Sequence, residues 1–269
     1  YYKLIEERKN RRIATTGGET SGGTTSSGRG SKLLAPGEKS TAKGARLEAS
    51  NVRAFVLGTD GKWTKNPTTG GWSFTLEGGL PLNNIWGSIT YKDESGKDVT
   101  RWYFFNSDST MVTGWHFDTS SNKWFYLNPK AGDEIGQMQT GWVYDNNKWY
   151  FMNLESGALS IGWAKAPDNR WYLFDESGAM LTGWQKIKDT YYYLHSTGVM
   201  AQGEWVKNKD DGAWYYFNYN GEMAKRKWIK DGTNTFYVHS NGKMATDEWV
   251  QGAGDTWYYL LLDGKMARD

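Results

Sequence analysis

The amino-acid sequence predicts an all-β fold, a β-solenoid of about nine stacked β-hairpin repeats with an extended N-terminal leader. A tryptophan recurs nine times between Trp63 and Trp249, at intervals of 21 to 29 residues. Each leading tryptophan is followed by a three-residue cluster rich in aromatics, and each cluster by a turn and a closing apolar residue, usually methionine. Such self-similarity at a nearly constant period indicates a repeat architecture, in which each unit packs mainly against its neighbours.

The composition favours a row of small cores over one large core. The 269 residues include 16 Trp and 33 Gly, and the mean hydropathy is -0.74. Because few aliphatic residues are available, aromatic side chains must build the interior. The absence of cysteine excludes disulfides and thiolate metal sites. No apolar run reaches membrane-spanning length, so we expect no membrane insertion.

Residues 1–51 form a leader that we expect to have little structure of its own. Its segment 15–31 is rich in Gly, Ser and Thr and contains no apolar residue, which is typical of a flexible linker. Residues 52–57 are apolar enough for a strand. We expect this strand to cap the first end of the array, which extends over residues 52–269, since stacked repeats need atypical terminal units.

Turn signals divide each repeat into two short strands. Residues that tolerate a positive φ separate most leading tryptophans from their clusters, at 145–147, 168–169, 211–212, 231–232 and 254–255. An isolated hairpin is only marginally stable in water, so each hairpin must bury its aromatic face on the next. Two copies depart in length: residues 92–97 lengthen the turn of one hairpin, and residues 129–137 lengthen the turn after the next cluster.

The repeat pattern is similar to that of a known family. Gly183-Trp184, then Tyr191-Tyr192-Tyr193-Leu194, then a glycine and Met200, resembles the cell-wall-binding repeats of Gram-positive surface proteins and phage lysins, best known as choline-binding modules. The resemblance covers residues 63–269 and implies a left-handed solenoid that holds choline or phosphocholine of cell-wall teichoic acids between its repeats. It also implies a secreted protein of the bacterial cell surface.

A sister branch of glucan-binding repeats shares the tryptophan and the aromatic cluster, and it implies α-glucan or another carbohydrate as the ligand. The regular 21-residue step and the closing methionines favour choline. A purely structural stalk, and a homodimer formed through one end of the solenoid, stay open as alternatives.

Other function classes are disfavoured. The three histidines, His116, His195 and His239, lie in different repeats, and no zinc-protease, nucleophile-elbow or phosphate-loop motif occurs. We therefore predict no catalysis, no cofactor and no metal. The array has more acidic than basic residues, which argues against nucleic acid as a partner despite the aromatics.

Strand alternation predicts which aromatics bind the ligand. Successive side chains of a strand point to opposite faces, so the first and third residues of a cluster share one face. We expect the leading tryptophan and the cluster-first residue of one repeat to meet the cluster-third residue of the next. The complete trios are then Trp86/Trp102/Tyr126, Trp115/Trp124/Phe151, Trp163/Trp171/Tyr193, Trp184/Tyr191/Tyr216 and Trp205/Trp214/Tyr237.

Each trio suits a quaternary ammonium, which has no N–H to donate and is held best by ring faces, at about 0.5–2 kcal/mol per ring. We expect Met180 and Met223 to form the floors of two trios, because a thioether packs well on aromatics. Two trios lack a ring, Trp142/Trp149/Leu173 and Trp228/Thr235/Tyr259, and should bind weakly or serve only for packing. A slip of one residue would replace Tyr193 by Tyr192 and Tyr237 by Phe236.

Overall fold

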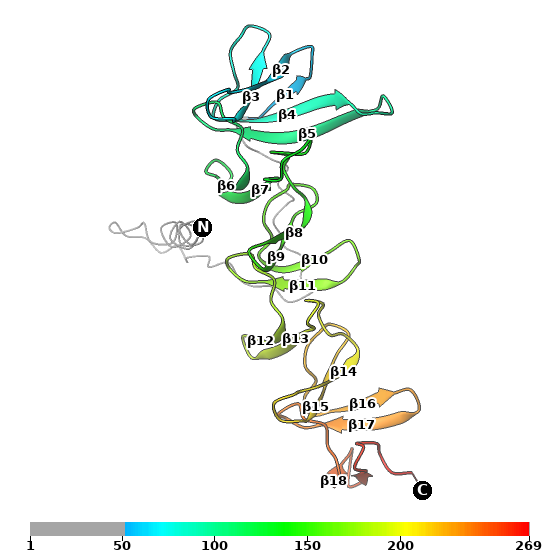
Figure 1. Ribbon diagram of the computed structural model, residues 1–269. Coiled ribbons are helices and arrows are strands. Elements are labelled where there is room, and N and C mark those ends of the chain that lie inside the picture. The colour runs from blue at the N-terminus through cyan, green and yellow to red at the C-terminus, as the bar shows by residue number, and fades with distance from the viewer. Residues whose placement is uncertain (1–51, 269) are drawn as a thin grey trace, which may run out of the picture. The chain divides into compact units, whose positions relative to one another are not determined.

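A computed structural model describes residues 52–268, and these residues form short β-strands with no helix among them (Figure 1). The strands are β1 (Val52–Val56), β2 (Gly61–Lys65), β3 (Trp72–Leu76), β4 (Ile85–Lys92), β5 (Asp98–Phe105), β6 (Gly114–Asp118), β7 (Lys123–Leu127), β8 (Gly141–Asp145), β9 (Lys148–Met152), β10 (Gly162–Lys165), β11 (Trp171–Phe174), β12 (Gly183–Ile187), β13 (Thr190–Leu194), β14 (Glu204–Lys207), β15 (Trp214–Phe217), β16 (Lys227–Asp231), β17 (Asn234–Val238), β18 (Glu248–Gln251) and β19 (Trp257–Leu260). From β2 to β19, consecutive strands pair as antiparallel hairpins, nine in the described part of the chain. The predicted all-β fold of about nine hairpins is confirmed.

The described residues divide into two compact units, which are treated separately below. Residues 52–161 carry β1–β9, and residues 162–268 carry β10–β19. The leader expected for residues 1–51 lies outside the described residues.

In the first unit, the strand expected at residues 52–57 is β1. It pairs in parallel with β4, so that β1, β4 and β5 form a three-stranded sheet. Phe55 of β1 is buried in a cluster with Phe74, Tyr103 and Phe105. The apolar run therefore extends the sheet of one hairpin and contributes a ring to the first core.

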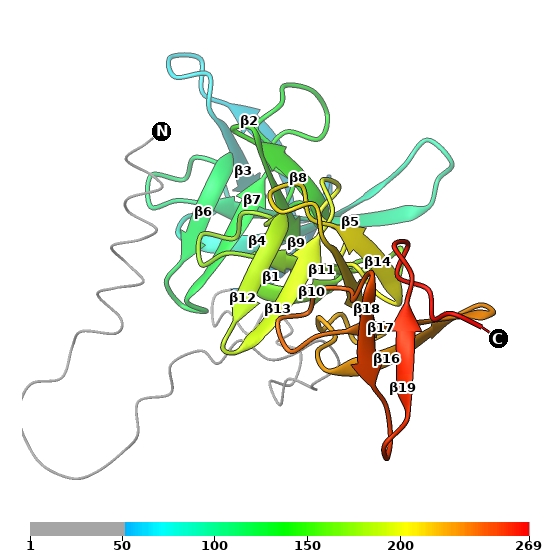
Figure 2. The ribbon, with the colours of Figure 1, turned by 90° about the horizontal axis from the view of Figure 1, so that it is seen from below.

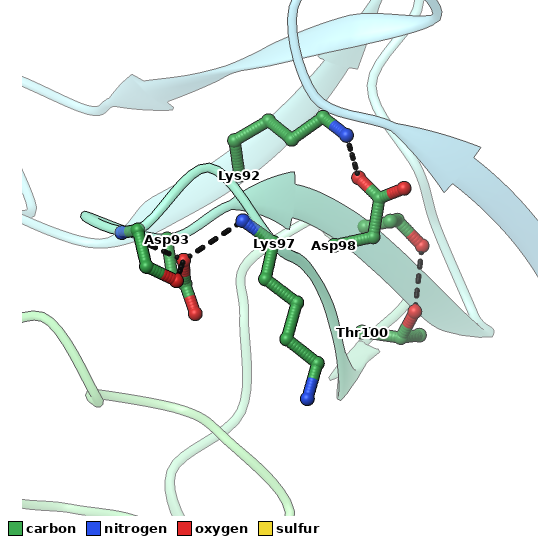
Figure 3. Close-up of polar contacts among 7 residues, drawn as sticks. Lys92, Asp93, Lys97, Asp98 and Thr100 are labelled. Carbon is green, nitrogen blue, oxygen red and sulfur yellow. Dashed lines mark hydrogen bonds and ion pairs between the residues drawn. The ribbon is translucent and has the colours of Figure 1, made fainter.

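The lengthened turn at residues 92–97 joins β4 and β5 (Figure 3). The Asp93 carboxylate accepts hydrogen bonds from the backbone N–H groups of Ser95 (2.9 Å) and Lys97 (3.0 Å), and also from the Ser95 hydroxyl (2.7 Å). These bonds lower the pKa of Asp93. Lys92 and Asp98 form an ion pair of 2.8 Å across the strand ends. The turn is thus closed by its own side chains.

One register rule describes how the hairpins stack. The leading tryptophan lies directly opposite the cluster-third residue of its own hairpin, as Trp184 opposite Tyr193, so both point to one face. The cluster-second residue points to the other face. Trp184 packs edge-on against the second residue of the next cluster, Tyr215, with ring centroids 4.9 Å apart and planes at 76°. One face of each hairpin therefore packs on the opposite face of the next, as in a β-solenoid.

The same contact recurs within each unit, at Trp63–Tyr103, Trp86–Phe125, Trp115–Tyr150, Trp163–Tyr192, Trp205–Phe236 and Trp228–Tyr258. In the second unit, successive hairpins point in different directions, as β12–β13, β16–β17 and β18–β19 show in Figure 2.

The closing methionine connects neighbouring hairpins through the backbone. Its N–H donates to the cluster-first carbonyl of the preceding hairpin, as from Met200 to Trp171 and from Met223 to Tyr191, both 2.9 Å. The methionine of one repeat therefore belongs to the cleft of the repeat before it.

Candidate functional site

Each inter-repeat cleft is built from two consecutive hairpins. The first hairpin supplies the leading tryptophan and the cluster-first residue, and the second supplies the cluster-second ring and the closing methionine. At Trp184 the ring centroids lie 6.4 Å from Tyr191 and 4.9 Å from Tyr215, with planes at 78° and 76°. Met223 is buried in the same cluster. Two rings thus stand nearly perpendicular to a third, and a thioether packs in the same cluster.

The predicted trios named the wrong ring from the second hairpin. The cluster-third residues pack on the tryptophan of their own hairpin, because directly opposite residues of an antiparallel pair share a face. These contacts are Tyr126–Trp115 (4.8 Å), Phe151–Trp142 (5.1 Å), Tyr193–Trp184 (5.5 Å), Tyr216–Trp205 (5.1 Å) and Tyr237–Trp228 (4.9 Å). The cluster-second ring meets the leading tryptophan instead. With this ring in place, the candidate trios become Trp86/Trp102/Phe125, Trp115/Trp124/Tyr150, Trp163/Trp171/Tyr192, Trp184/Tyr191/Tyr215 and Trp205/Trp214/Phe236.

The assignment of the two methionines also needs correction. Met200 packs in the cluster of Trp163 and Trp171, while Met180 lies against the turn at Gly198. Met223 lies at the Trp184 cleft, and Met244 is the residue bonded to the Trp214 carbonyl. The reason is the backbone bond described above, which shifts each methionine by one repeat.

Trp102, predicted to bind the ligand together with Trp86 and Tyr126, lies beside a cleft that protein covers. Trp86 is 1% exposed, and so is Phe125, the ring that faces it. Trp102 is half-buried and packs against the core cluster that contains both of these rings. Tyr126 lies on Trp115 instead. The Trp86 cleft is therefore closed, and Trp102 packs against it.

The exposure of the tryptophan side chains shows which of the remaining clefts are closed and which are open. Trp124 is 6% exposed, and Phe117 lies across it with centroids 5.1 Å apart, so the trio of Trp115 is closed as well. In the second unit the leading tryptophans of complete trios are half-buried, and Trp214 is 40% exposed. Among the trios predicted from the sequence, the accessible ones are those of Trp163, Trp184 and Trp205.

The structure adds a cleft that the sequence prediction did not include. Trp63 lies 4.9 Å from Tyr103 with planes at 70°, and the Met111 N–H donates to the Trp72 carbonyl (2.7 Å). Both tryptophans are half-buried. The first cluster has Ser73 in place of a central aromatic residue, so the sequence pattern did not predict this cleft. The spacing of Trp63 and Trp72 nevertheless follows the repeat.

The trio predicted to lack a ring at Trp228 surrounds a cavity of about 300 Å³, lined by Trp228, Thr235, Gly252, Ala253, Tyr258 and Met266. Tyr258, not Tyr259, faces Trp228, with centroids 5.3 Å apart and planes at 75°. Thr235 holds the place of the cluster-first ring. The cavity is therefore a cleft with two rings and a missing third. At the other such trio, Trp142 and Trp149 are 36% and 44% exposed.

Two cluster-second tyrosines are anchored by carboxylates of their own hairpin turns. The Tyr172 hydroxyl donates to Asp168 (2.7 Å) and that of Tyr215 to Asp211 (2.8 Å). Burial, together with these bonds, raises the pKa of each tyrosine to about 12. A bond from Lys243 is the main reason that the pKa of Asp211 falls to about 2. These rings stay neutral and fixed in orientation.

Each of the three histidines contacts a neighbouring side chain of the array. His195 bonds to Glu204 (3.1 Å) and His239 to Glu248 (2.9 Å), the same pairing two repeats apart. His116 stacks on Phe104, with centroids 3.9 Å apart, and burial lowers its pKa to about 4.

Within residues 52–268, no three His, Asp or Glu side chains gather as metal ligands would. The same residues include no helix with the length and hydrophobicity to cross a membrane.

Two families match the sequence. The choline-binding repeat matches residues 95–135, 160–205 and 181–228. The putative cell wall binding repeat matches residues 140–159, 227–244 and 247–266. No curated protein matches the sequence.

Solved structures from Streptococcus pneumoniae are similar to this chain. CbpJ is 31% identical, and the alignment covers 73% of this chain and 70% of CbpJ with a TM-score of 0.57. The choline-binding domain of CbpL is 27% identical over 77% of this chain and 97% of that domain, with a TM-score of 0.58. The modular autolysin LytC, solved with a synthetic peptidoglycan ligand, is 28% identical over 72% of this chain but only 40% of LytC, with a TM-score of 0.54.

Proposed function

Because the chain belongs to the family of choline-binding, cell-wall-binding repeat proteins, we propose that its hairpin array holds the choline groups of cell-wall teichoic acids in the aromatic clefts. The array acts as a binding module that attaches the protein to the bacterial cell wall, and the chain is secreted and non-catalytic. The observation that supports this most directly is the Trp184 cleft, where Tyr191 and Tyr215 stand nearly perpendicular to Trp184 and Met223 packs in the same cluster.

The chemistry of the cleft suits a quaternary ammonium. Its charge is covered by methyl groups, so it is attracted to the negative faces of several rings at once and needs no acceptor. An α-glucan would instead use one or two rings as a platform and hydrogen bonds at the rim. Titrating the protein with choline and with an α-glucan, followed by tryptophan fluorescence, separates the two ligands. Hydrolysis of cell wall or glucan by the purified chain would contradict the non-catalytic assignment.

Removing a ring from a complete trio should weaken choline binding. We expect Trp171→Ala to cost about 0.5–2 kcal/mol at its cleft, because Trp163, Tyr192 and Met200 are left to hold the cation. The matched control is Trp102→Ala, beside the Trp86 cleft that protein covers, and it should have the smaller effect on choline binding. Calorimetry on variants with unchanged circular dichroism measures both. Equal losses would refute the assignment.

Adding the missing ring should create a better site. We expect Thr235→Tyr to complete the cleft of Trp228 and Tyr258 and to strengthen choline binding there by about 0.5–2 kcal/mol, since the cavity of about 300 Å³ has room for a ring. Thr235→Val changes the hydroxyl without adding a ring and should have no such effect. Calorimetric affinity and stoichiometry report the gain, and a Tyr variant that binds like wild type counts against the cage mechanism.

A further inference from the structure

Lysines occupy one repeated position beside the clefts. The residue two positions after a leading tryptophan lies directly opposite the cluster-first residue. Lys186 is opposite Tyr191, and Lys207 is opposite Trp214. The same position holds a lysine opposite Trp72, Trp171 and Thr235, namely Lys65, Lys165 and Lys230.

The lysine ammonium groups reach the rings that border the clefts. Lys186 Nζ lies 5.6 Å from the centroid of the Tyr191 ring, and Lys207 Nζ lies 5.9 Å from the centroid of the Trp214 ring. Lys225, which precedes β16, places a second ammonium 5.5 Å from Tyr191. Its Nζ also donates to the backbone carbonyl of Asp189 (3.2 Å). These ring distances are close to the outer limit of about 6 Å for a cation–π contact, so the rings hold the lysines only weakly.

The ammonium groups of Lys186 and Lys207 have no carboxylate partner among the described residues. Both side chains are exposed, and within residues 52–268 neither forms an ion pair with a carboxylate. Stacking does not require a lysine at this position either, because β6 has Phe117 and β8 has Tyr144 there, each lying against the cluster-first tryptophan. The clefts at Trp184 and Trp205 therefore carry a free positive charge at their edge.

A free ammonium beside a cage for cations discriminates between ligands. It repels choline, whose only charge is positive. It attracts a phosphate attached to the choline oxygen, because lysine binds phosphate as a point charge. In such a zwitterion the trimethylammonium enters the rings while the phosphate stays at the exposed edge. We propose that Lys186 and Lys207 make their clefts selective for phosphorylated choline over free choline, an inference that rests on the proposed function.

The test compares two ligands on two variants. Wild type should bind phosphocholine about two- to fivefold more tightly than choline at each such cleft, the range expected for one exposed ion pair. The double variant Lys186→Met/Lys207→Met keeps the apolar stems, so at the Trp184 and Trp205 clefts it should lose this preference while binding choline as tightly as wild type or slightly better. The control Lys209→Met/Lys230→Met removes the same number of charges from positions without a ring opposite, and it should keep the preference.

Salt provides an independent readout. Raising the ionic strength from about 0.05 M to about 0.5 M should erase the preference for phosphocholine and leave choline binding nearly unchanged, because salt screens exposed charge pairs. The inference is overturned if wild type binds both ligands equally, or if the Lys186→Met/Lys207→Met variant keeps the preference. If choline itself does not bind, the proposed function fails and this inference falls with it. If choline binds without a preference, only this inference fails.

Discussion

Replacing Gly221 with alanine is expected to lower the stability of residues 162–268 by about 2–5 kcal/mol. Gly221 lies in the turn after β15 with φ at +84°, and an added Cβ would lie 2.4 Å from Met200 Sδ. The left-handed conformation costs an L-residue about 1–2 kcal/mol. Displacing Met200, which is 2% exposed, adds the cost of overpacking a core, about 1–3 kcal/mol. Urea unfolding monitored by tryptophan fluorescence measures the change.

Gly212→Ala is the matched control. Gly212 also has a positive φ, +70°, but an added Cβ would meet nothing within 4 Å. It should therefore show the conformational cost alone, about 1–2 kcal/mol. The difference between the two variants isolates the contact between the closing methionine of one hairpin and the turn of the next. Equal destabilisation would mean that this contact adds nothing.

Acid is expected to destabilise the first unit through His116. Its pKa is lowered from 6.5 to about 4 by burial, against a smaller opposing effect of Asp118. Above pH 6.5 neither the folded nor the unfolded state carries the proton, so His116 has no effect on stability. Between pH 6.5 and 4 the unfolded chain takes up a proton that the folded chain excludes, and the free energy of unfolding falls, by about 2–3 kcal/mol in total.

His116→Phe tests this directly. The variant keeps a ring against Phe104 and removes the Nε2 atom, which is buried without a hydrogen-bond partner in the described structure. Carboxylates also lose stability in acid. One is Asp118, where burial raises the pKa but bonds from two serines together outweigh it and lower the pKa. The decisive quantity is therefore the difference between the two stability curves, which should open as the pH falls from 6.5 to 4. Parallel curves from urea unfolding at each pH would show that His116 is not the sensor.

The repeat, the hairpins and the stacking of their aromatic faces are predictable from the sequence. These features follow from local properties: the spacing of the tryptophans, the turn residues between strands, and the alternation of side chains along a strand. The lengthened turn at residues 92–97 and the strand at residues 52–57 were predictable for the same reason. The resemblance to cell-wall-binding repeats followed from the order of glycine-tryptophan, aromatic cluster and closing methionine, and the matches to the family confirm it.

How one hairpin meets the next depends on the packing between repeats. Trp163 could face Tyr192 or Tyr193, and a single residue separates the two choices. Alternation assigns Tyr193 to the face of its own Trp184, but the ring that reaches Trp163 depends on the offset and rotation between stacked hairpins. No local sequence pattern specifies that offset.

The same offset decides which methionine closes a cleft and which clefts are open. Because of this offset, the Met200 N–H donates to the Trp171 carbonyl, and Trp86 and Trp124 are buried. Trp102 therefore packs against a core and does not border an open cage. The offset also leaves the cavity beside Thr235. Hairpins form from contacts close in sequence, whereas the clefts form from contacts between repeats, so the sequence predicts the ring types of the site better than their partners.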